Sequence, residues 1–356
     1  MSPEFPGITA LARPNIRTMK PYSSARNEFK GTAQLMLDAN ENPFGSPDTG
    51  FNIAFNRYPD PLQWELKNQL SRIKGVPANH IFLGNGSDEI IDLMIRIFCE
   101  PGKDNILICT PTYGMYQVAA AISNVEVREV PLNASFQLDL DAIAIQTDSN
   151  SKLLILCSPN NPTGNSFYRE DIEVVLNNFP GMVMMDEAYI NYSRQHSFIR
   201  ELTEYPNLVV MQTLSKAWGL AGLRIGMAFG ALDLIELLNK VKPPYNISTV
   251  DQSLALRALQ NPQTVNDWIQ QVIRERNRMQ MALEQFPWVE KVFPSDANFL
   301  LFRVTDAYHL YDYLIQQGIV VRNRSKDFGC SNCLRITIGS ESENTRFLDV
   351  ATSYQP

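Results

Sequence analysis

Four mainly apolar runs of strand length most constrain what this chain can fold into. They span residues 105–109, 152–157, 182–185 and 207–211. Each run is continuous rather than alternating, which is typical of strands in a sheet that is covered on both faces. Stretches with helical spacing lie between them, as in α/β proteins. The sequence therefore predicts an α/β fold with a mostly parallel sheet.

Polar residues follow these apolar runs at once. Asp186, for example, comes directly after residues 182–185, and Lys216 follows residues 207–211 after a short turn. Open α/β sheets bind their ligands beyond the carboxyl ends of their strands. We therefore expect a ligand site at one edge of the sheet, and we expect these two side chains to belong to it.

Length and composition bound the class of protein. The chain has 356 residues, more than one hydrophobic core usually holds, so a large and a small domain are expected. Hydrophobic residues make up 44% and charged residues 19%, which indicates a globular protein. The 31 basic and 38 acidic residues give a net charge of −7, which argues against a nucleic-acid surface.

The sequence shows neither a membrane span nor a signal for secretion. No apolar run approaches the ~20 residues that cross a bilayer, and residues 1–6 do not resemble a signal peptide. The five cysteines are sparse, and the pair Cys330 and Cys333 has no second pair and no histidine nearby, so no metal site is expected. The expected compartment is the cytoplasm.

The organisation of the chain follows from breaks in these patterns. Residues 1–40 carry few periodic signals and are expected to form an N-terminal arm that joins the small domain. The pattern breaks again at residues 242–246, so we place the large, ligand-binding domain at residues 41–245. The apolar runs after this point predict a small α+β domain at residues 246–356.

The stretch from Thr213 to Gly226 carries the clearest chemical signal. Lys216 leaves a predicted strand on a short turn, and Arg224 follows eight residues later. A lysine held in this way can form an imine with an aldehyde cofactor, and Ser215 with Arg224 can hold a phosphate. A surface lysine after a strand is the alternative interpretation of an isolated Ser-Lys pair.

A second phosphate signal lies in residues 84–89. Gly84 and Gly86 precede a helix that is predicted to start near Ser87, so backbone N–H groups can converge on an anion there. Glu89 replaces the third glycine of a dinucleotide fingerprint, which argues against a nicotinamide dehydrogenase. A simple turn remains the alternative interpretation of this segment.

These stretches resemble the motifs of the fold-type I pyridoxal-phosphate aminotransferases. Residues 160–164 and 186–189 resemble two more of that family's motifs, and each motif follows a predicted strand. The resemblance covers nearly the whole chain. It implies the fold of this family, in which helices cover a mostly parallel sheet in the large domain and a small α+β domain follows.

The resemblance also implies roles for individual residues. Lys216 would hold pyridoxal 5′-phosphate as a Schiff base, and Asp186 would keep the pyridine nitrogen protonated. Tyr189, the third residue expected to be catalytic, would hydrogen-bond the cofactor's phenolic oxygen together with Asn161. The residues expected to bind the cofactor are Tyr58, Gly86, Ser87, Asp88, Tyr113, Asn161, Asp186, Tyr189, Ser215, Lys216 and Arg224.

Three segments, 98–104, 112–116 and 334–339, are most similar to the histidinol-phosphate aminotransferases within this family. The resemblance implies conversion of histidinol phosphate and 2-oxoglutarate to imidazole acetol phosphate and glutamate, in histidine biosynthesis. It also implies a homodimer in which Tyr58 reaches the neighbouring subunit's cofactor. The residues expected to bind substrate are Tyr22, Asn40, Arg322 and Arg335.

Other functions stay open from the sequence alone. An aminotransferase acting on aromatic amino acids and a threonine-phosphate decarboxylase share the fold and the lysine motif. A cofactor-binding regulatory module is not favoured, because no DNA-binding appendage is evident. The three histidines lie near no serine or cysteine nucleophile motif, so nothing indicates a hydrolase. The expected partners are small-molecule substrates and a second copy of the chain, with no nucleic acid and no membrane.

Overall fold

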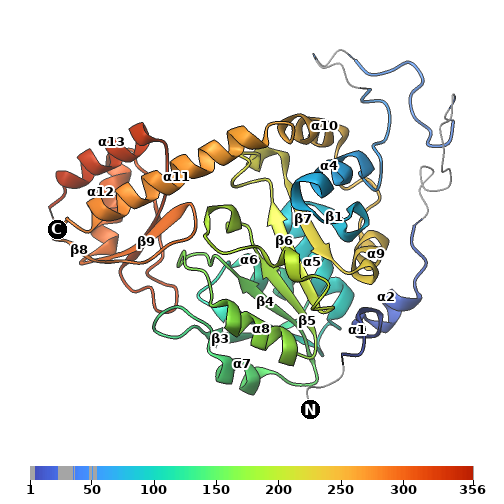
Figure 1. The fold of residues 1–356 in the computed structure, drawn as a ribbon, viewed down its shortest axis with the longest axis horizontal. Helices are drawn as coiled ribbons and strands as arrows, with labels where there is room; N and C mark the ends of the chain where they lie inside the picture. Colours follow the sequence, from blue (N-terminus) through green and yellow to red (C-terminus); the bar gives the residue numbers. More distant parts are fainter. Residues whose placement is uncertain (1–4, 23–34, 36, 48–49, 51–53, 356) are drawn as a thin grey trace.

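A computed structural model describes residues 5–22, 35, 37–47, 50 and 54–355. Helices surround a large central sheet, and a smaller unit that holds the C-terminal strands and helices lies to one side (Figure 1). The long helix α11 (Pro262–Leu283) runs between the two units (Figure 1). No helix in the described ranges is long and apolar enough to cross a membrane.

The large sheet has seven strands in the order β1-β7-β6-β5-β4-β2-β3. The five strands from β6 to β3 are parallel, while β1 and β7 are antiparallel to their neighbours. The predicted mostly parallel sheet is therefore confirmed. The strands are β1 (Ile81–Asn85), β2 (Asn105–Thr110), β3 (Glu126–Pro131), β4 (Ser151–Cys157), β5 (Met182–Asp186), β6 (Leu208–Thr213) and β7 (Ile225–Gly230).

Alternate residues of each central strand enter different cores, which explains why the apolar runs are continuous. In β2, Ile106 and Ile108 pack with the helices on one face, and Leu107 and Cys109 pack with those on the other. One face carries α5 (Gly86–Phe98), α6 (Met115–Ile122) and α9 (Leu232–Val241). The other carries α4 (Trp64–Lys74), α7 (Leu140–Gln146), α8 (Arg169–Asn178) and α10 (Thr249–Ala258).

Short 3₁₀ helices complete the large unit. They are η1 (Ala78–His80), η2 (Ile190–Tyr192), η3 (Phe198–Glu201) and η4 (Ala221–Leu223). Of these, η4 lies between β6 and β7 in the chain, so it belongs to the connection that carries Lys216 and Arg224.

The smaller unit contains an antiparallel sheet in the order β10-β11-β9-β8. Its elements are β8 (Val289–Val292), β9 (Phe299–Val304), α12 (Ala307–Gln316), β10 (Arg322–Asn323), β11 (Cys333–Thr337) and α13 (Glu341–Thr352). This α+β arrangement agrees with the expectation from the sequence.

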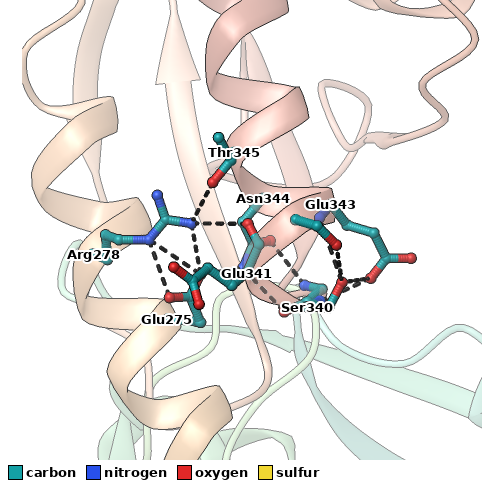
Figure 2. A network of polar contacts seen from close by, with 9 residues as sticks. Glu275, Arg278, Ser340, Glu341, Glu343, Asn344 and Thr345 are labelled. Atoms are coloured by element: carbon teal, nitrogen blue, oxygen red, sulfur yellow. Dashed lines mark hydrogen bonds and ion pairs between the residues drawn. The ribbon is translucent and has the colours of Figure 1, made fainter.

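Polar contacts fasten α13 to α11. Arg278 of α11 donates hydrogen bonds to Glu275, at 2.7 Å, and to the hydroxyl of Thr345, at 3.2 Å (Figure 2). Ser340 and Glu343 form a capping box, which satisfies backbone N–H groups at the start of α13. The two helices are thus held together where they cover the small sheet.

The boundary between the units differs from the predicted one at residue 245. The helix α10 packs against α4 of the large unit, so the sequence break at residues 242–246 ends α9 without starting a new domain. The border falls inside α11, where Val265 and Ile269 belong to the large core and Met279 and Leu283 to the small one. An amphipathic helix whose apolar residues recur along its whole length gives no sequence signal for such a border.

The N-terminal arm also differs from its prediction over the residues that can be described. Two short helices, α1 (Ile8–Leu11) and α2 (Pro14–Thr18), place Ile8, Ala12 and Ile16 in the core formed with α5 and α9. This stretch therefore packs on the large unit, and the expected docking to the small domain is wrong there. The four-residue spacing puts the three apolar side chains on one side, where α5 and α9 bury them. Residues 1–4, 23–34 and 36 of the predicted arm lie outside the described residues.

Gly226→Ala should destabilise the fold, because β7 approaches the start of α5 closely at this point. A Cβ atom at residue 226 would lie 2.5 Å from the backbone of both Gly86 and Ser87. We expect a loss of about 1–3 kcal/mol in the free energy of unfolding, measured by denaturant titration. Gly222→Ala is the matched control, because a Cβ atom there meets nothing within 4 Å. Equal stability of the two variants would contradict the close approach.

Candidate active site

The carboxyl ends of the parallel strands border a cavity of about 510 Å³. It lies at the edge of the sheet where the polar strand ends predicted a ligand site. Predicted cofactor and substrate residues that line the cavity are Ser87, Asp88, Tyr113, Asn161, Asp186, Tyr189, Ser215, Lys216, Arg224, Arg322 and Arg335. They come from both units, so the cavity depends on how the two pack together.

Asp186, the last residue of β5, is a buried carboxylate at this cavity. The hydroxyl of Tyr116 donates to its Oδ2 at 2.5 Å, and the N–H of Ala188 donates to its Oδ1 at 3.0 Å. Burial raises the pKa of Asp186 to about 6, and the hydrogen bond from Tyr116 opposes that rise. A cationic ring nitrogen beside this carboxylate would offset the cost of its burial.

Lys216 lies on the turn that follows β6. The N–H of Ser215 donates to Oγ1 of Thr213 at 3.0 Å, and the N–H of Gly219 donates to the carbonyl of Lys216 at 3.0 Å. Its Nζ lies 5.6 Å from the centroid of the Tyr189 ring. Burial, followed by the positive charge of Arg335, lowers the pKa of Lys216. Lowering this pKa increases the neutral, nucleophilic fraction of the amine.

Asn161 connects the large unit to the small one. Its Nδ2 donates to the hydroxyl of Tyr189 at 3.4 Å, and its Oδ1 accepts a hydrogen bond from Nη1 of Arg335 on β11. Burial raises the pKa of Tyr189 well above its ordinary value, so this hydroxyl stays protonated at neutral pH. The predicted pair Asn161 and Tyr189 therefore lies together, as a pair of polar groups facing one ligand atom requires.

The glycine loop and Arg224 form a cationic cradle at the start of α5. The N–H of Gly86 donates to the carbonyl of Arg224 at 2.6 Å, and Nη2 of Arg224 lies 3.2 Å from Oδ2 of Asp88. Gly86 has a φ of +72°, a conformation that strains other residues, and a Cβ atom there would also lie 2.5 Å from Nη2 of Arg224. Tyr113 donates to Oδ1 of Asp88 at 3.3 Å. The N-terminus of a helix next to a guanidinium group suits a phosphate.

Two arginines of the small sheet complete the cavity wall. Arg322 of β10 and Arg335 of β11 are directly opposed in an antiparallel pair. Like charges placed opposite one another cost stability, about 0.2–1 kcal/mol. Burial, together with the positive charges of Arg324 and Arg322, lowers the pKa of Arg335. An anion bound between the two guanidinium groups would relieve this repulsion.

Four predicted residues do not line this cavity within the single chain. Gly86 lies directly behind it, against Arg224, and the other three lie elsewhere. The ring of Tyr58 stacks on Tyr245 with centroids 4.5 Å apart, beside a separate cavity of about 430 Å³ that Asn40 also lines. Tyr22 is 71% exposed. The resemblance assigns Tyr58 to a neighbouring subunit, so its role stays a prediction, as do those of Asn40 and Tyr22.

Two contributing residues were not singled out from the sequence. Tyr116 lies one helical turn after Tyr113, and this spacing was the signal that it points to the same site. Arg324 lies two residues after Arg322, a spacing that places both side chains on one face of a strand. Among the described residues, no group of three or more His, Cys, Asp or Glu side chains could hold a metal ion.

The residues fit pyridoxal phosphate on three observations. A buried carboxylate takes a protonated ring nitrogen, an accessible lysine with a lowered pKa takes an aldehyde, and the cradle at Gly86 and Arg224 takes a phosphate. The model of class I and II aminotransferases matches residues 32–350. The chain belongs to this family. Class I and II aminotransferases use pyridoxal phosphate, so the predicted cofactor is confirmed.

This aminotransferase chain is similar to proteins that bear one more specific name. A protein from Parabacteroides distasonis, named histidinol-phosphate aminotransferase, is 51% identical over 339 residues, which cover 95% of this chain and 96% of the relative. The crystal structure of the histidinol-phosphate aminotransferase from Clostridium acetobutylicum has a TM-score of 0.77 at 26% identity, over 83% of this chain and 90% of that one.

The same fold also occurs with a different named activity. The structure of L-threonine-O-3-phosphate decarboxylase from Porphyromonas gingivalis has a TM-score of 0.72 at 24% identity. It covers 84% of this chain and 90% of that one. This likeness shows a shared fold alone, so the fold does not separate aminotransferase from decarboxylase chemistry.

Lys216 should be the residue that holds the cofactor covalently, because it is the lysine that lines the cavity. Reduction of the cofactor-loaded protein with borohydride should fix the label on the peptide that contains Lys216, as read by mass spectrometry. The variant Lys216→Arg should stay unlabelled after the same treatment. A label on any other lysine of the unaltered protein would overturn the assignment.

Asp186→Asn should keep the cofactor bound and still lose most of the activity. The amide cannot hold a proton on the ring nitrogen as the carboxylate does, so transition-state stabilisation falls by several kcal/mol, on the order of 10³-fold in rate. Cofactor content is measured by absorbance and turnover by steady-state kinetics. Tyr116→Phe is the milder comparison, since it removes one hydrogen bond and keeps the charge. Near-normal turnover of Asp186→Asn would refute the role.

Proposed function

We propose that the protein is a histidinol-phosphate aminotransferase. It transfers the amino group of L-histidinol phosphate to 2-oxoglutarate and gives imidazole acetol phosphate and L-glutamate, a step of histidine biosynthesis. The observation that carries this proposal is the 51% identity, over nearly the full length, to a relative that bears this name. The site geometry supports it independently.

The paired arginines of the small sheet match the anions of both substrates. Histidinol phosphate has a phosphate and no α-carboxylate, whereas glutamate has two carboxylates. One wall must therefore accept either anion in alternation. The planar guanidinium group of arginine can donate two hydrogen bonds to a phosphate or to a carboxylate. Arg322 and Arg335 place two such groups side by side in the cavity.

The chain's own residues divide the chemical work. When bound, the cofactor supplies an electron sink for the electron pair that remains after the substrate Cα–H bond is broken. Lys216 Nζ takes the proton from the Cα of the amino donor. It returns a proton to the Cα of glutamate when 2-oxoglutarate receives the amino group. Its lowered pKa permits both steps. Asp186 would stabilise the positive charge of the ring nitrogen, while Asn161 and Tyr189 would orient the phenolic oxygen.

The two alternative activities receive less support. A decarboxylase shares the fold, but its likeness is at 24% identity, against 51% for the named aminotransferase relative. An aminotransferase for aromatic amino acids would use one arginine for the α-carboxylate and an apolar wall for the ring. The cavity that contains Lys216 is instead lined by three arginines of the small unit, Arg322, Arg324 and Arg335.

A homodimer with shared sites belongs to the same proposal. Several apolar side chains near the N-terminus are uncovered in the single chain, with Leu37 82% exposed and Phe44 95% exposed. We infer that these side chains are covered by a second copy of the chain. Tyr58 lies in the same region and is half-exposed. We also place the enzyme in the cytoplasm, which agrees with five buried, free cysteines.

Arg322→Ala should lower kcat/KM for histidinol phosphate about 10- to 150-fold, because a charge-assisted contact contributes ~1.5–3 kcal/mol. Phenylalanine, which lacks a phosphate, should lose far less in the same variant. Steady-state kinetics with 2-oxoglutarate as acceptor measure both donors, and dephosphorylated histidinol serves as a further control. The proposal fails if phenylalanine outpaces histidinol phosphate, or if threonine phosphate releases carbon dioxide.

Mixing two inactive variants should restore activity if the sites are shared between subunits. Lys216→Ala and Tyr58→Phe chains form mixed dimers in which one site carries both lesions and the other is intact. At full exchange about a quarter of all sites are then intact. Activity is measured after subunit exchange has been verified by mass spectrometry. Absence of recovery after verified exchange would argue against a shared site.

A further inference from the structure

A third arginine belongs to the cavity wall. Arg324 follows Arg322 by two residues, and its N–H donates to the carbonyl of Cys333 at 2.9 Å, which continues the pairing between β10 and β11. Residues two apart on a strand lie on the same face, so Arg322, Arg324 and Arg335 form one cationic surface. All three line the cavity that contains Lys216.

Arg324 is held in place by an acidic neighbour in the turn that follows β10. Its Nε lies 2.6 Å from Oδ2 of Asp327, and the N–H of Asp327 donates to the carbonyl of Arg324 at 2.9 Å. Both side chains are about three-quarters buried, at 26% and 27% exposure. Within the described part of the chain, no hydrogen-bond acceptor meets the terminal amino groups of Arg324. The ion pair therefore fixes the side chain by one edge and leaves the other edge available.

The formal charge of this surface is +2, from three arginines and one aspartate. A phosphate monoester carries about −1.5 to −2 charges at pH 7, whereas one carboxylate carries −1. The Coulomb energy scales with the product of the charges. Each unit of positive charge on the wall therefore favours the phosphate about twice as strongly as it favours a carboxylate.

We propose that Arg324, restrained by Asp327, is a specificity-determining residue that favours the phosphate of the amino donor over the carboxylate of the co-substrate. Asp327 reduces the positive charge of the wall, so that the carboxylate substrate and product are held less tightly. This inference rests on the proposed function, because it concerns the choice between the two substrates of that reaction.

Arg324→Gln tests the proposal in the two half-reactions of the cofactor-loaded enzyme. For histidinol phosphate, kcat/KM should fall about 10- to 100-fold. For glutamate it should fall by only about the square root of that factor, roughly 3- to 10-fold, because the ligand charge is halved. Each half-reaction is followed by the change in cofactor absorbance under single-turnover conditions. Arg96→Gln is the matched control, since Arg96 forms a surface ion pair with Asp92 on α5.

The acidic partner provides a second, independent variant. Asp327→Asn raises the formal charge of the wall by one, so the preference for histidinol phosphate over glutamate should rise. The double variant Arg324→Gln with Asp327→Asn restores the formal charge of +2, and its preference should return close to that of the unaltered enzyme. If Arg324→Gln does not fold, Asp327→Asn alone decides, because an unchanged or lower preference contradicts the proposal.

Inorganic phosphate gives a readout that does not depend on the donor. It should inhibit the glutamate half-reaction competitively, and its inhibition constant should rise in Arg324→Gln and stay unchanged in Arg96→Gln. An unaltered enzyme that does not react with histidinol phosphate would overturn the proposed function. An unaltered enzyme that does react, together with an unchanged preference in Arg324→Gln, would overturn this inference alone.

Discussion

The burial of one carboxylate, Asp186, is the constraint on which the site depends. Burial raises its pKa from 3.8 to about 6, which corresponds to a penalty of about 3 kcal/mol for the ionised form. Because the folded chain holds this proton more tightly than the unfolded chain, the contribution of Asp186 to stability falls as the pH rises from about 4 to about 6. At neutral pH a protonated ring nitrogen offsets that penalty, so cofactor binding and folding are coupled at the end of β5.

Much of the fold and site could be predicted because both follow from local patterns. Continuous apolar runs occur where alternate residues, such as Ile106 and Leu107, face different cores. Parallel strands then bring Asp186 and Lys216 to one edge of the sheet, although they are thirty residues apart in the sequence. Asp186 and Lys216 each belong to a family motif that follows the end of a strand. For this reason the resemblance identified most of the residues that line the cavity.

What the sequence did not reveal depends on contacts between distant elements. Tyr116 was one of several aromatic residues in an apolar segment, and only the packing of α6 against β5 selects it as the partner of Asp186. Arg324 had the spacing of a second cavity residue, but its pairing with Asp327 appears only in three dimensions. The border inside α11 was hidden for the same reason, since a continuous helix carries apolar residues for two cores.

That helix has a mechanical consequence. With 22 residues α11 is about 33 Å long, and its first turns are anchored in the large core while its last turns are anchored beneath the small sheet. A rotation of this helix about its end in the large unit would therefore move the small unit with it. A tilt of about 5° displaces the far end of such a rod by about 3 Å, comparable to the length of a hydrogen bond. The far end of α11 contacts β8 and β9, and β9 pairs with β11, which carries Arg335. A slight pivot of this one helix would therefore move the arginine wall relative to Lys216 and change the space left for the substrate's anion.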